Sequence, residues 1–276
     1  MNLTILTDGN KEFGLGHLYR SQALAMFLIM KGHSVEVITL SAINLKTLFI
    51  NNDVIIDIPY HGDFLHKKIN NNSKIIGLDY NGEVNLDLVI NVFDYQRYMG
   101  SNQISSFEYV IIREQISNLI NKTFIRNEAV LIMLGAHDIN NYATDIIKSL
   151  DEKKIQTVVV EKEKSIDFEP FNYCIGYENP DNVAQIMQCS AWAISNGGSS
   201  MLELMSLGKA THVFPQTKAE KALATKIFKE GGLLGIGTPI SFPSIEKINR
   251  VGNIAKKMID GLGLNRLEER IKEIVE

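Results

Sequence analysis

The sequence predicts an α/β protein of two Rossmann-like domains with a ligand cleft between them. Apolar runs of strand length recur along the chain and alternate with helical patterns, as in repeated βαβ units. Several of these runs end in polar side chains, such as Asp57 and Asp79, which is typical of the carboxyl ends of parallel strands. Periodicity is lost between Asn118 and Asn127, so we expect one domain at 1–122 and a second, with terminal helices, at 123–276.

Composition excludes several classes of protein. The 276 residues are 45% hydrophobic and 22% charged, with a net charge of −4, which is ordinary for a globular protein and unlike a nucleic-acid-binding one. No apolar run reaches the roughly 20 residues of a membrane span. Because only Cys174 and Cys189 occur, and the start of the chain reads as a strand, we expect a cytoplasmic protein without disulfides. We also expect a monomer, although no sequence feature determines the oligomeric state.

The elements follow in order along each half. In the first half we expect strands at 3–6, 34–38, 53–57, 74–80, 86–91 and 109–114, and helices at 24–30, 42–50 and 64–69. In the second half we expect strands at 129–134, 156–160, 171–175, 191–195 and 210–214, and helices at 139–150, 180–188, 199–205, 219–229, 245–258 and 264–275.

A glycine-rich turn joins the first strand to the first helix. Gly14 and Gly16 precede His17, so backbone N–H groups lie unpaired at a helix N-terminus where an anion can bind. The simpler interpretation is a tight turn with His17 as a helix cap. Because the third glycine of the dinucleotide fingerprint is missing and a titratable imidazole is present, we favour a catalytic loop.

A second glycine-rich loop opens a helix in the other half. Gly197 and Gly198 allow a diphosphate to approach the backbone, and Ser199 and Ser200 add hydroxyl donors. Glu203 follows one helical turn later, where its carboxylate could accept hydrogen bonds from a ribose. The alternative is a plain turn with an ordinary helical glutamate. Two such loops facing one cleft favour a nucleotide-sugar site.

Several motifs together resemble a known family. Asp8-Gly9-Asn10 followed by Gly14-x-Gly16-His17-x-x-Arg20 resembles the signature of the UDP-2,4-diacetamido-2,4,6-trideoxy-β-L-altropyranose hydrolases of pseudaminic acid biosynthesis, which are related to the MurG-like glycosyltransferases. The similarity continues through Asp57 with Tyr60, 77–79, 109–114, 135–138 and 196–200 with Glu203.

This resemblance implies a GT-B fold and a UDP-sugar hydrolase of surface-glycan biosynthesis that needs no metal or cofactor. The counterpart of His17 would activate water against C1 of the sugar while UDP leaves. The implied substrate-binding residues are Asp8, Gly14, Gly16, Arg20, Asp57, Tyr60, Gly135, His137, Asn196, Gly197, Gly198, Ser199, Ser200 and Glu203.

Departures from the family pattern leave alternatives open. The family's Asp-His-Tyr is replaced by Asp57-Ile58-Pro59-Tyr60-His61, and its Gly-Gly-Thr by Gly135-Ala136-His137. These changes concern the sugar more than the nucleotide. The main alternative is a GT-B glycosyltransferase in which His17 deprotonates an acceptor hydroxyl. A non-catalytic binding subunit is the third, and the presence of His17 argues against it because a binder needs no base.

Overall fold

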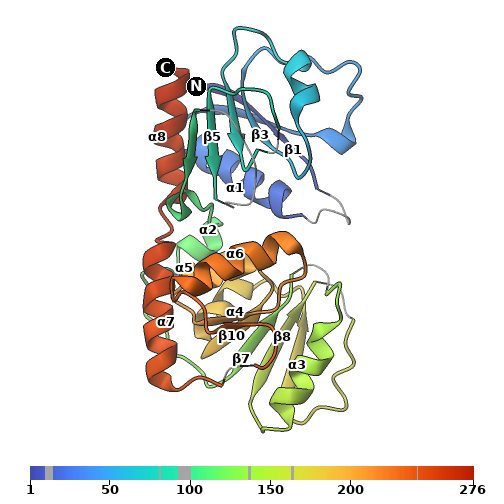
Figure 1. Ribbon diagram of the computed structural model, residues 1–276, viewed down its shortest axis with the longest axis vertical. Coiled ribbons are helices and arrows are strands. Elements are labelled where there is room, and N and C mark those ends of the chain that lie inside the picture. Colours follow the sequence, from blue (N-terminus) through green and yellow to red (C-terminus); the bar gives the residue numbers. More distant parts are fainter. Residues whose placement is uncertain (10–14, 81, 93–100, 136–137, 163–164, 241) are drawn as a thin grey trace. The chain divides into compact units, whose positions relative to one another are not determined.

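The computed structural model describes residues 1–9, 15–80, 82–92, 101–135, 138–162, 165–240 and 242–276. The chain forms two compact units, each of them described here by itself. The first domain comprises Met1–Arg113 and Gly261–Glu276, and the second comprises Glu114–Asp260. Within the described residues each domain has a six-stranded sheet, and all the registered strand pairs are parallel. The predicted α/β class with two domains is confirmed (Figure 1).

The division of the chain differs from the predicted 1–122 and 123–276. Helix α8 (Gly263–Val275) returns to the first domain, because its Leu267 and Ile271 pack into the same core as Leu24 and Leu28 of α1 (Gly16–Met30). The segment after Arg113 belongs to the second domain. A helix that crosses back after the second domain leaves no compositional signal in the sequence.

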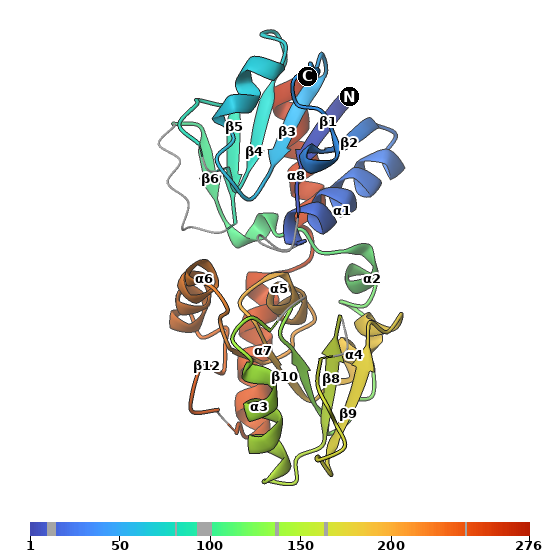
Figure 2. The same cartoon turned by 90° about the vertical axis from the view of Figure 1, so that its right-hand side faces the viewer.

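The first sheet has the order β2-β1-β3-β4-β5-β6, which Figure 2 shows as adjacent arrows. Side chains alternate along β1: Leu3 and Ile5 face the core shared with α1 and α8, whereas Leu6 faces a second core on the other side. Both faces are therefore buried, as the continuous apolar runs predicted. The strands are β1 (Asn2–Thr7), β2 (Ser34–Thr39), β3 (Asp53–Asp57), β4 (Ile75–Leu78), β5 (Leu88–Asn91) and β6 (Gln103–Ser105).

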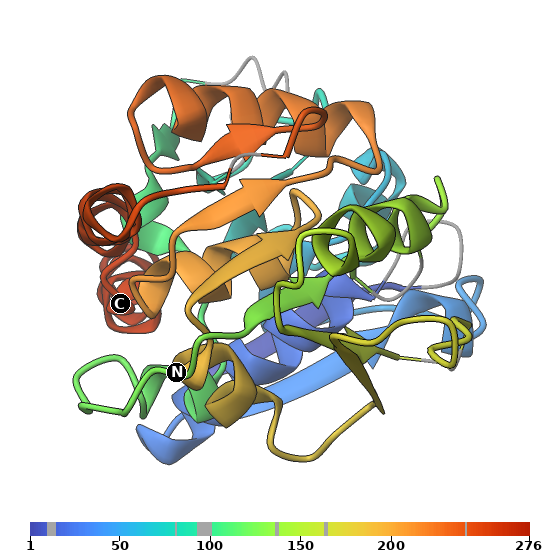
Figure 3. The same ribbon diagram turned by 90° about the horizontal axis from the view of Figure 1, so that it is seen from below.

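The second sheet has the order β12-β11-β10-β7-β8-β9, and Figure 3 shows its β7, β10, β11 and β12 as neighbouring arrows from green to orange. Its strands are β7 (Val130–Met133), β8 (Thr157–Glu161), β9 (Cys174–Glu178), β10 (Trp192–Ser195), β11 (Thr211–Val213) and β12 (Gly235–Ile236). Its helices are α2 (Glu114–Ser117), α3 (Tyr142–Asp151), α4 (Val183–Cys189), α5 (Ser199–Ser206), α6 (Lys218–Lys229) and α7 (Ile245–Met258).

Two predicted elements are wrong. No helix spans 42–50; the segment holds only the end of a 3₁₀ turn, Leu40–Ala42, and the side chain of Asn44 accepts a hydrogen bond from the N–H of Lys46 instead. The apolar run 109–114 is not a strand. Tyr109 ends a 3₁₀ turn and the exposed Glu114 begins α2. Val110 is buried beside α8, whose Gly263 lies so close that an added Cβ would come within 2.1 Å of the Val110 carbonyl oxygen. The edge strand is the polar β6.

The strand orders place a topological switch point in each sheet. In the first sheet, β1 has β2 on one side and β3 on the other; in the second, β7 has β8 on one side and β10 on the other. In open α/β sheets, ligands bind outside the carboxyl ends of the strands at such points. Asp8 and Asp57 stand at the first switch point, and Gly135 and Asn196 stand at the second.

Removing packing atoms from α8 should destabilise the first domain. Ile271 is fully buried, so Ile271→Ala should lower the free energy of unfolding by about 2–5 kcal/mol, measured by urea denaturation. The exposed neighbour Glu269 gives the matched control, and Glu269→Ala should change stability by less than about 0.5 kcal/mol. Equal stabilities of the two variants would show that α8 does not belong to this core.

Candidate functional site

The first cluster of functional side chains is organised around the carboxylate of Asp57. This residue ends β3 and is fully buried. One carboxylate oxygen lies 2.7 Å from Nδ1 of His17, and the other accepts a hydrogen bond of 2.8 Å from the hydroxyl of Ser21. The guanidinium of Arg20 donates to both oxygens through Nε, at 3.0 and 2.9 Å. Residues 17, 20 and 21 share one end of α1, so the first turns of this helix carry all three partners.

Arg20 is held between two carboxylates. Its Nη2 donates to Asp57, and its Nη1 donates to Asp79 over 2.5 Å. Asp79 follows β4 in a left-handed conformation, and its other oxygen accepts the backbone N–H of Val92 at 2.7 Å. The guanidinium therefore joins the carboxyl ends of β3 and β4 to the start of α1.

The geometry selects one tautomer of His17. Asp57 at 2.7 Å offers only an acceptor, while Arg20 Nη2 at 3.1 Å offers only a donor, so Nδ1 cannot satisfy both. If Nδ1 were unprotonated, its lone pair would point at a lone pair of the nearer Asp57 carboxylate oxygen, and the two would repel each other. We therefore assign the proton to Nδ1, which donates to Asp57 and leaves Nε2 free to accept a proton. The side chain of His17 is 19% exposed, so a small molecule can reach the ring.

The electrostatics keep Asp57 ionised. Burial alone would raise its pKa, but the charge of Arg20 and the hydrogen bonds from His17 and Arg20 hold the pKa of Asp57 well below its usual range. Burial would likewise lower the pKa of Arg20, but Asp57 and Asp79 raise it above its ordinary value. A fixed negative charge thus faces the imidazole and stabilises the imidazolium that forms when Nε2 takes up a proton.

Asp8 and Tyr60 form a second pair at the same edge. The hydroxyl of Tyr60 donates to Asp8 over 2.7 Å, and the N–H of Gly9 donates to the other oxygen at 2.9 Å. Burial and the bond to Asp8 raise the pKa of Tyr60, while the pKa of Asp8 is lowered because hydrogen bonds from Tyr60, Ser41 and Gly9 outweigh its burial. The ring of Tyr60 stacks on Phe64 with centroids 6.4 Å apart.

The second domain presents its glycine-rich loop at the start of α5. Gly198 is the N-cap of this helix and supplies no side-chain cap. Its carbonyl accepts the N–H groups of Met201 and Leu202, so those of Ser199 and Ser200 lie before the first intrahelical hydrogen bonds. Ser199 is exposed and Ser200 half-buried there. Gly135 has φ of 86° and approaches Asn196 so closely that an added Cβ would lie 3.0 Å from its Nδ2. Anion binding at this helix start stays a prediction, and the positive end of the α5 dipole lies there.

Several residues predicted to bind substrate have contacts that the sequence did not reveal. Asp57 and Arg20 lie within the His17 cluster, and Glu203 is 4% exposed on α5. A direct contact of these groups with a sugar or ribose stays a prediction. Gly14 and His137 lie outside the described residues, so the structure says nothing about them.

Sequence reasoning left out four residues that the structure places at these sites. Ser21 and Asp79 join the cluster at Asp57, and Gln216 and Glu220 join the loop at Asn196. Of these four, only Asp79 could have been assigned to the site from the sequence, because it stands at the end of an apolar run of strand length, as Asp57 does. The other three are ordinary polar residues near helix starts, and only the tertiary fold brings them into contact.

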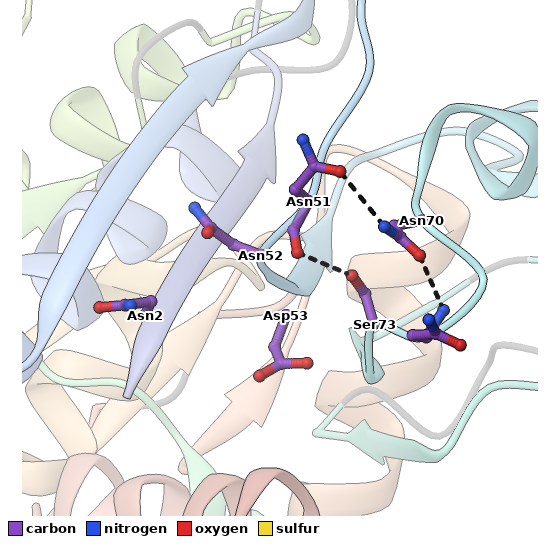
Figure 4. A pocket seen from close by; sticks show the side chains of 7 residues that line it. Asn2, Asn51, Asn52, Asp53, Asn70 and Ser73 are labelled. Carbon is purple, nitrogen blue, oxygen red and sulfur yellow. Dashed lines mark hydrogen bonds between the residues drawn. The ribbon is translucent and has the colours of Figure 1, made fainter.

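A polar depression of about 300 Å³ lies elsewhere on the first domain. Of the lining residues drawn in Figure 4, Asn2 and Asp53 begin β1 and β3, and Ser73 precedes β4, so the depression lies at the edge of the sheet opposite the candidate site. Asn51 accepts hydrogen bonds from the side chains of Asn70 and Ser73 within it. Among the described residues no group of three or more His, Cys, Asp or Glu is arranged to hold a metal ion. No helix in the described ranges is long and apolar enough to cross a bilayer.

Comparison with solved structures shows a GT-B fold along the whole chain. Acinetobacter baumannii MurG matches with a TM-score of 0.67 at 9% identity, over 99% of this chain and 100% of that one. The S. aureus MnaA–UDP structure matches with 0.62 at 11% identity, over 99% and 96% of the two chains, and the spinosyn forosaminyltransferase SpnP with 0.61 at 8%, over the full length of both. No protein-family model and no curated protein sequence matches the chain.

These neighbours correct one prediction. The predicted UDP-sugar hydrolase is contradicted, because several structural neighbours are named as sugar transferases, among them the calicheamicin glycosyltransferase CalG4 and the spinosyn forosaminyltransferase SpnP. The resemblance to the MurG-like group is supported at the level of the fold, whereas the altropyranose hydrolase family is not confirmed.

The buried Asp57 should give stability a characteristic pH dependence. A carboxylate whose pKa is depressed by folding contributes stability above its unfolded pKa of about 3.9, and this contribution is lost as the pH falls toward the folded pKa. Asp57→Asn should therefore lower the free energy of unfolding by about 3–5 kcal/mol at neutral pH and by progressively less below about pH 4. Urea unfolding over this pH range measures the difference. The control is Glu36→Gln on an exposed part of β2; a deficit of Asp57→Asn that stays constant with pH would contradict the charge arrangement.

Proposed function

We propose that this chain is a glycosyltransferase that moves a sugar from a UDP-sugar donor to an acceptor hydroxyl, with His17 as the general base. The observation that carries this proposal is the 2.7 Å contact between His17 Nδ1 and the buried carboxylate of Asp57. The GT-B neighbours support the class of reaction, since one is a complex with UDP and another a complex with thymidine diphosphate.

The chemistry at His17 is proton removal from the attacking hydroxyl. A neutral imidazole with a free Nε2 accepts that proton while the acceptor oxygen forms its bond to C1 of the sugar. Asp57 holds the ring in orientation and stabilises the positive charge that develops. Ser21 and Arg20 fix Asp57 in turn and leave its carboxylate no freedom to rotate. One displacement of this kind inverts the configuration at C1.

The leaving group is a nucleoside diphosphate. Its developing negative charge is stabilised by hydrogen-bond donors that are already in position before the reaction. The N-terminal N–H groups of α5 and the hydroxyls of Ser199 and Ser200 supply them, with the helix dipole adding to the effect. Asn196, Gly197 and Gly198 form the loop that leads into these donors, and we assign Glu203 to the ribose.

The sugar-facing side of the site is assigned to the first domain. Asp8 and Tyr60, joined by their 2.7 Å hydrogen bond, present two polar groups beside the His17 cluster. Carboxylate and phenol oxygens suit the recognition of sugar hydroxyl or acetamido groups. Gly16 at the start of α1 allows close backbone approach there.

Activity should require both an acceptor and His17. We expect UDP release from a panel of UDP-sugars only when an acceptor is added, with the glycoside formed in equal amount. His17→Ala should lower the rate by about 10²–10⁴-fold because the base is lost, while the affinity for UDP, measured by calorimetry, stays unchanged.

The matched control is His66, an exposed histidine in the 3₁₀ turn Asp63–Lys68 of the same domain. His66→Ala should transfer at the wild-type rate. Rapid UDP release without any acceptor, or full activity of His17→Ala, would contradict the proposed reaction or the proposed base respectively.

A further inference from the structure

The side chain of Glu220 does not make the hydrogen bond that is usual for a glutamate in the first turn of a capped helix. Thr217 caps α6, and its hydroxyl accepts the N–H of Glu220 at 3.1 Å. In such a Thr-x-x-Glu capping box the glutamate usually reaches back to the N–H of the cap residue. Glu220 instead accepts the N–H of Gln216, one residue earlier, at 2.6 Å and extends to another loop.

That other loop is the glycine-rich one after β10. Glu220 Oε1 accepts a hydrogen bond of 2.7 Å from the side-chain amide of Asn196, and Oε2 accepts one of 3.2 Å from the N–H of Gly197. The backbones approach closely here: a Cβ on Gly197 would lie 2.7 Å from Cβ and 2.8 Å from the carbonyl oxygen of Glu220. A glycine is therefore required at 197 for the carboxylate to reach this loop.

Gln216 extends the connection to a third loop. Its side-chain amide donates to Asp138 over 2.8 Å and accepts from the side chain of Asn140 over 2.9 Å. Asp138 in turn caps α3 through the N–H of Ala143 at 2.7 Å. The loops after β7, β10 and β11 are thereby joined at the switch point of the second sheet.

The charge of Glu220 also restricts where an anion can bind. The N–H of Gly197 is already engaged by a carboxylate, and a phosphate placed there would meet like charge at short range. The N–H groups of Met201 and Leu202 donate to the carbonyl of Gly198, so those that remain for an anion at the start of α5 belong to Ser199 and Ser200. Gly198 lies between the two regions, and a Cβ there would be 3.3 Å from Glu220 Oε1.

We propose that Glu220 is the positioning residue of the donor site. It holds the loop 196–198 so that the first N–H groups of α5 face the diphosphate, and it acts through Asn196 and Gly197 without touching the nucleotide. This inference rests on the proposed function, because it assigns the diphosphate of the donor to α5.

The test compares UDP with UMP, because only UDP carries the second phosphate. Calorimetry on the full-length protein should show that the wild type prefers UDP. Glu220→Ala should lower the affinity for UDP on the order of 10–100-fold and the affinity for UMP much less, because the loop no longer presents the α5 amides. Glu230→Ala, at the exposed other end of α6, should bind as the wild type does.

Glu220→Gln refines the test and replaces the alanine variant if that one fails to fold. Its amide oxygen can still accept the N–H groups of Gly197 and Gln216, but its NH₂ must face the Asn196 amide, so the preference for UDP should fall between those of the wild type and Glu220→Ala. Thermal unfolding checks that each variant is folded.

The outcomes separate the two proposals. A wild type that binds neither nucleotide overturns the proposed function and, with it, the role of Glu220. A wild type that prefers UDP, together with Glu220 variants that keep the same preference, overturns the positioning role alone. Equal losses of UDP and UMP affinity in the variants also overturn it, because they indicate a general structural effect.

Discussion

A carboxylate without access to water has to be surrounded by donors and positive charge, and Asp57 imposes this requirement on the first domain. Its partners are His17, Arg20 and Ser21, which all come from the first turns of α1. The register that pairs Thr7 with Asp57 brings the end of β1 to the end of β3, so the helix that follows β1 begins beside the carboxylate. The position of the proposed base thus follows from a strand register and a buried charge.

The candidate sites of the two domains provide opposite electrostatic environments. In the first, fixed negative charge favours a group that gains a proton. In the second, the dipole of α5 and the N–H groups of Ser199 and Ser200 at its start favour a group that gains negative charge. Transfer of a sugar from a diphosphate needs both kinds of environment, since the acceptor hydroxyl loses a proton while the diphosphate leaves. Both environments lie at the carboxyl edge of a parallel sheet, at the point where the strand order reverses.

Local sequence patterns predicted much of this structure. They failed where contacts between residues distant in the sequence determine the local conformation. The run Asp53–Asp57 was predicted as a buried strand from its continuous apolar residues, and it is β3. The equally apolar run 109–114 is not a strand, because α8 returns from the end of the chain and covers it. The sequence predicts that Asp57 contacts a sugar, whereas in the structure its partners include His17. The two residues are 40 positions apart, so no local sequence pattern indicates this contact. From the local sequence, Glu220 is an ordinary glutamate of a helix cap. Only the tertiary structure shows that its carboxylate binds the loop that contains Gly197.

The central claim is that Asp57 holds His17 as the Nδ1–H tautomer, with Nε2 free to act as a base. Nitrogen-15 NMR of the ring nitrogens, at a pH where the imidazole is neutral, measures this state directly. We expect a protonated Nδ1 and an unprotonated Nε2 for His17 in the wild type, and a mixture of tautomers in Asp57→Asn. A wild-type His17 that carries its proton on Nε2 would contradict it.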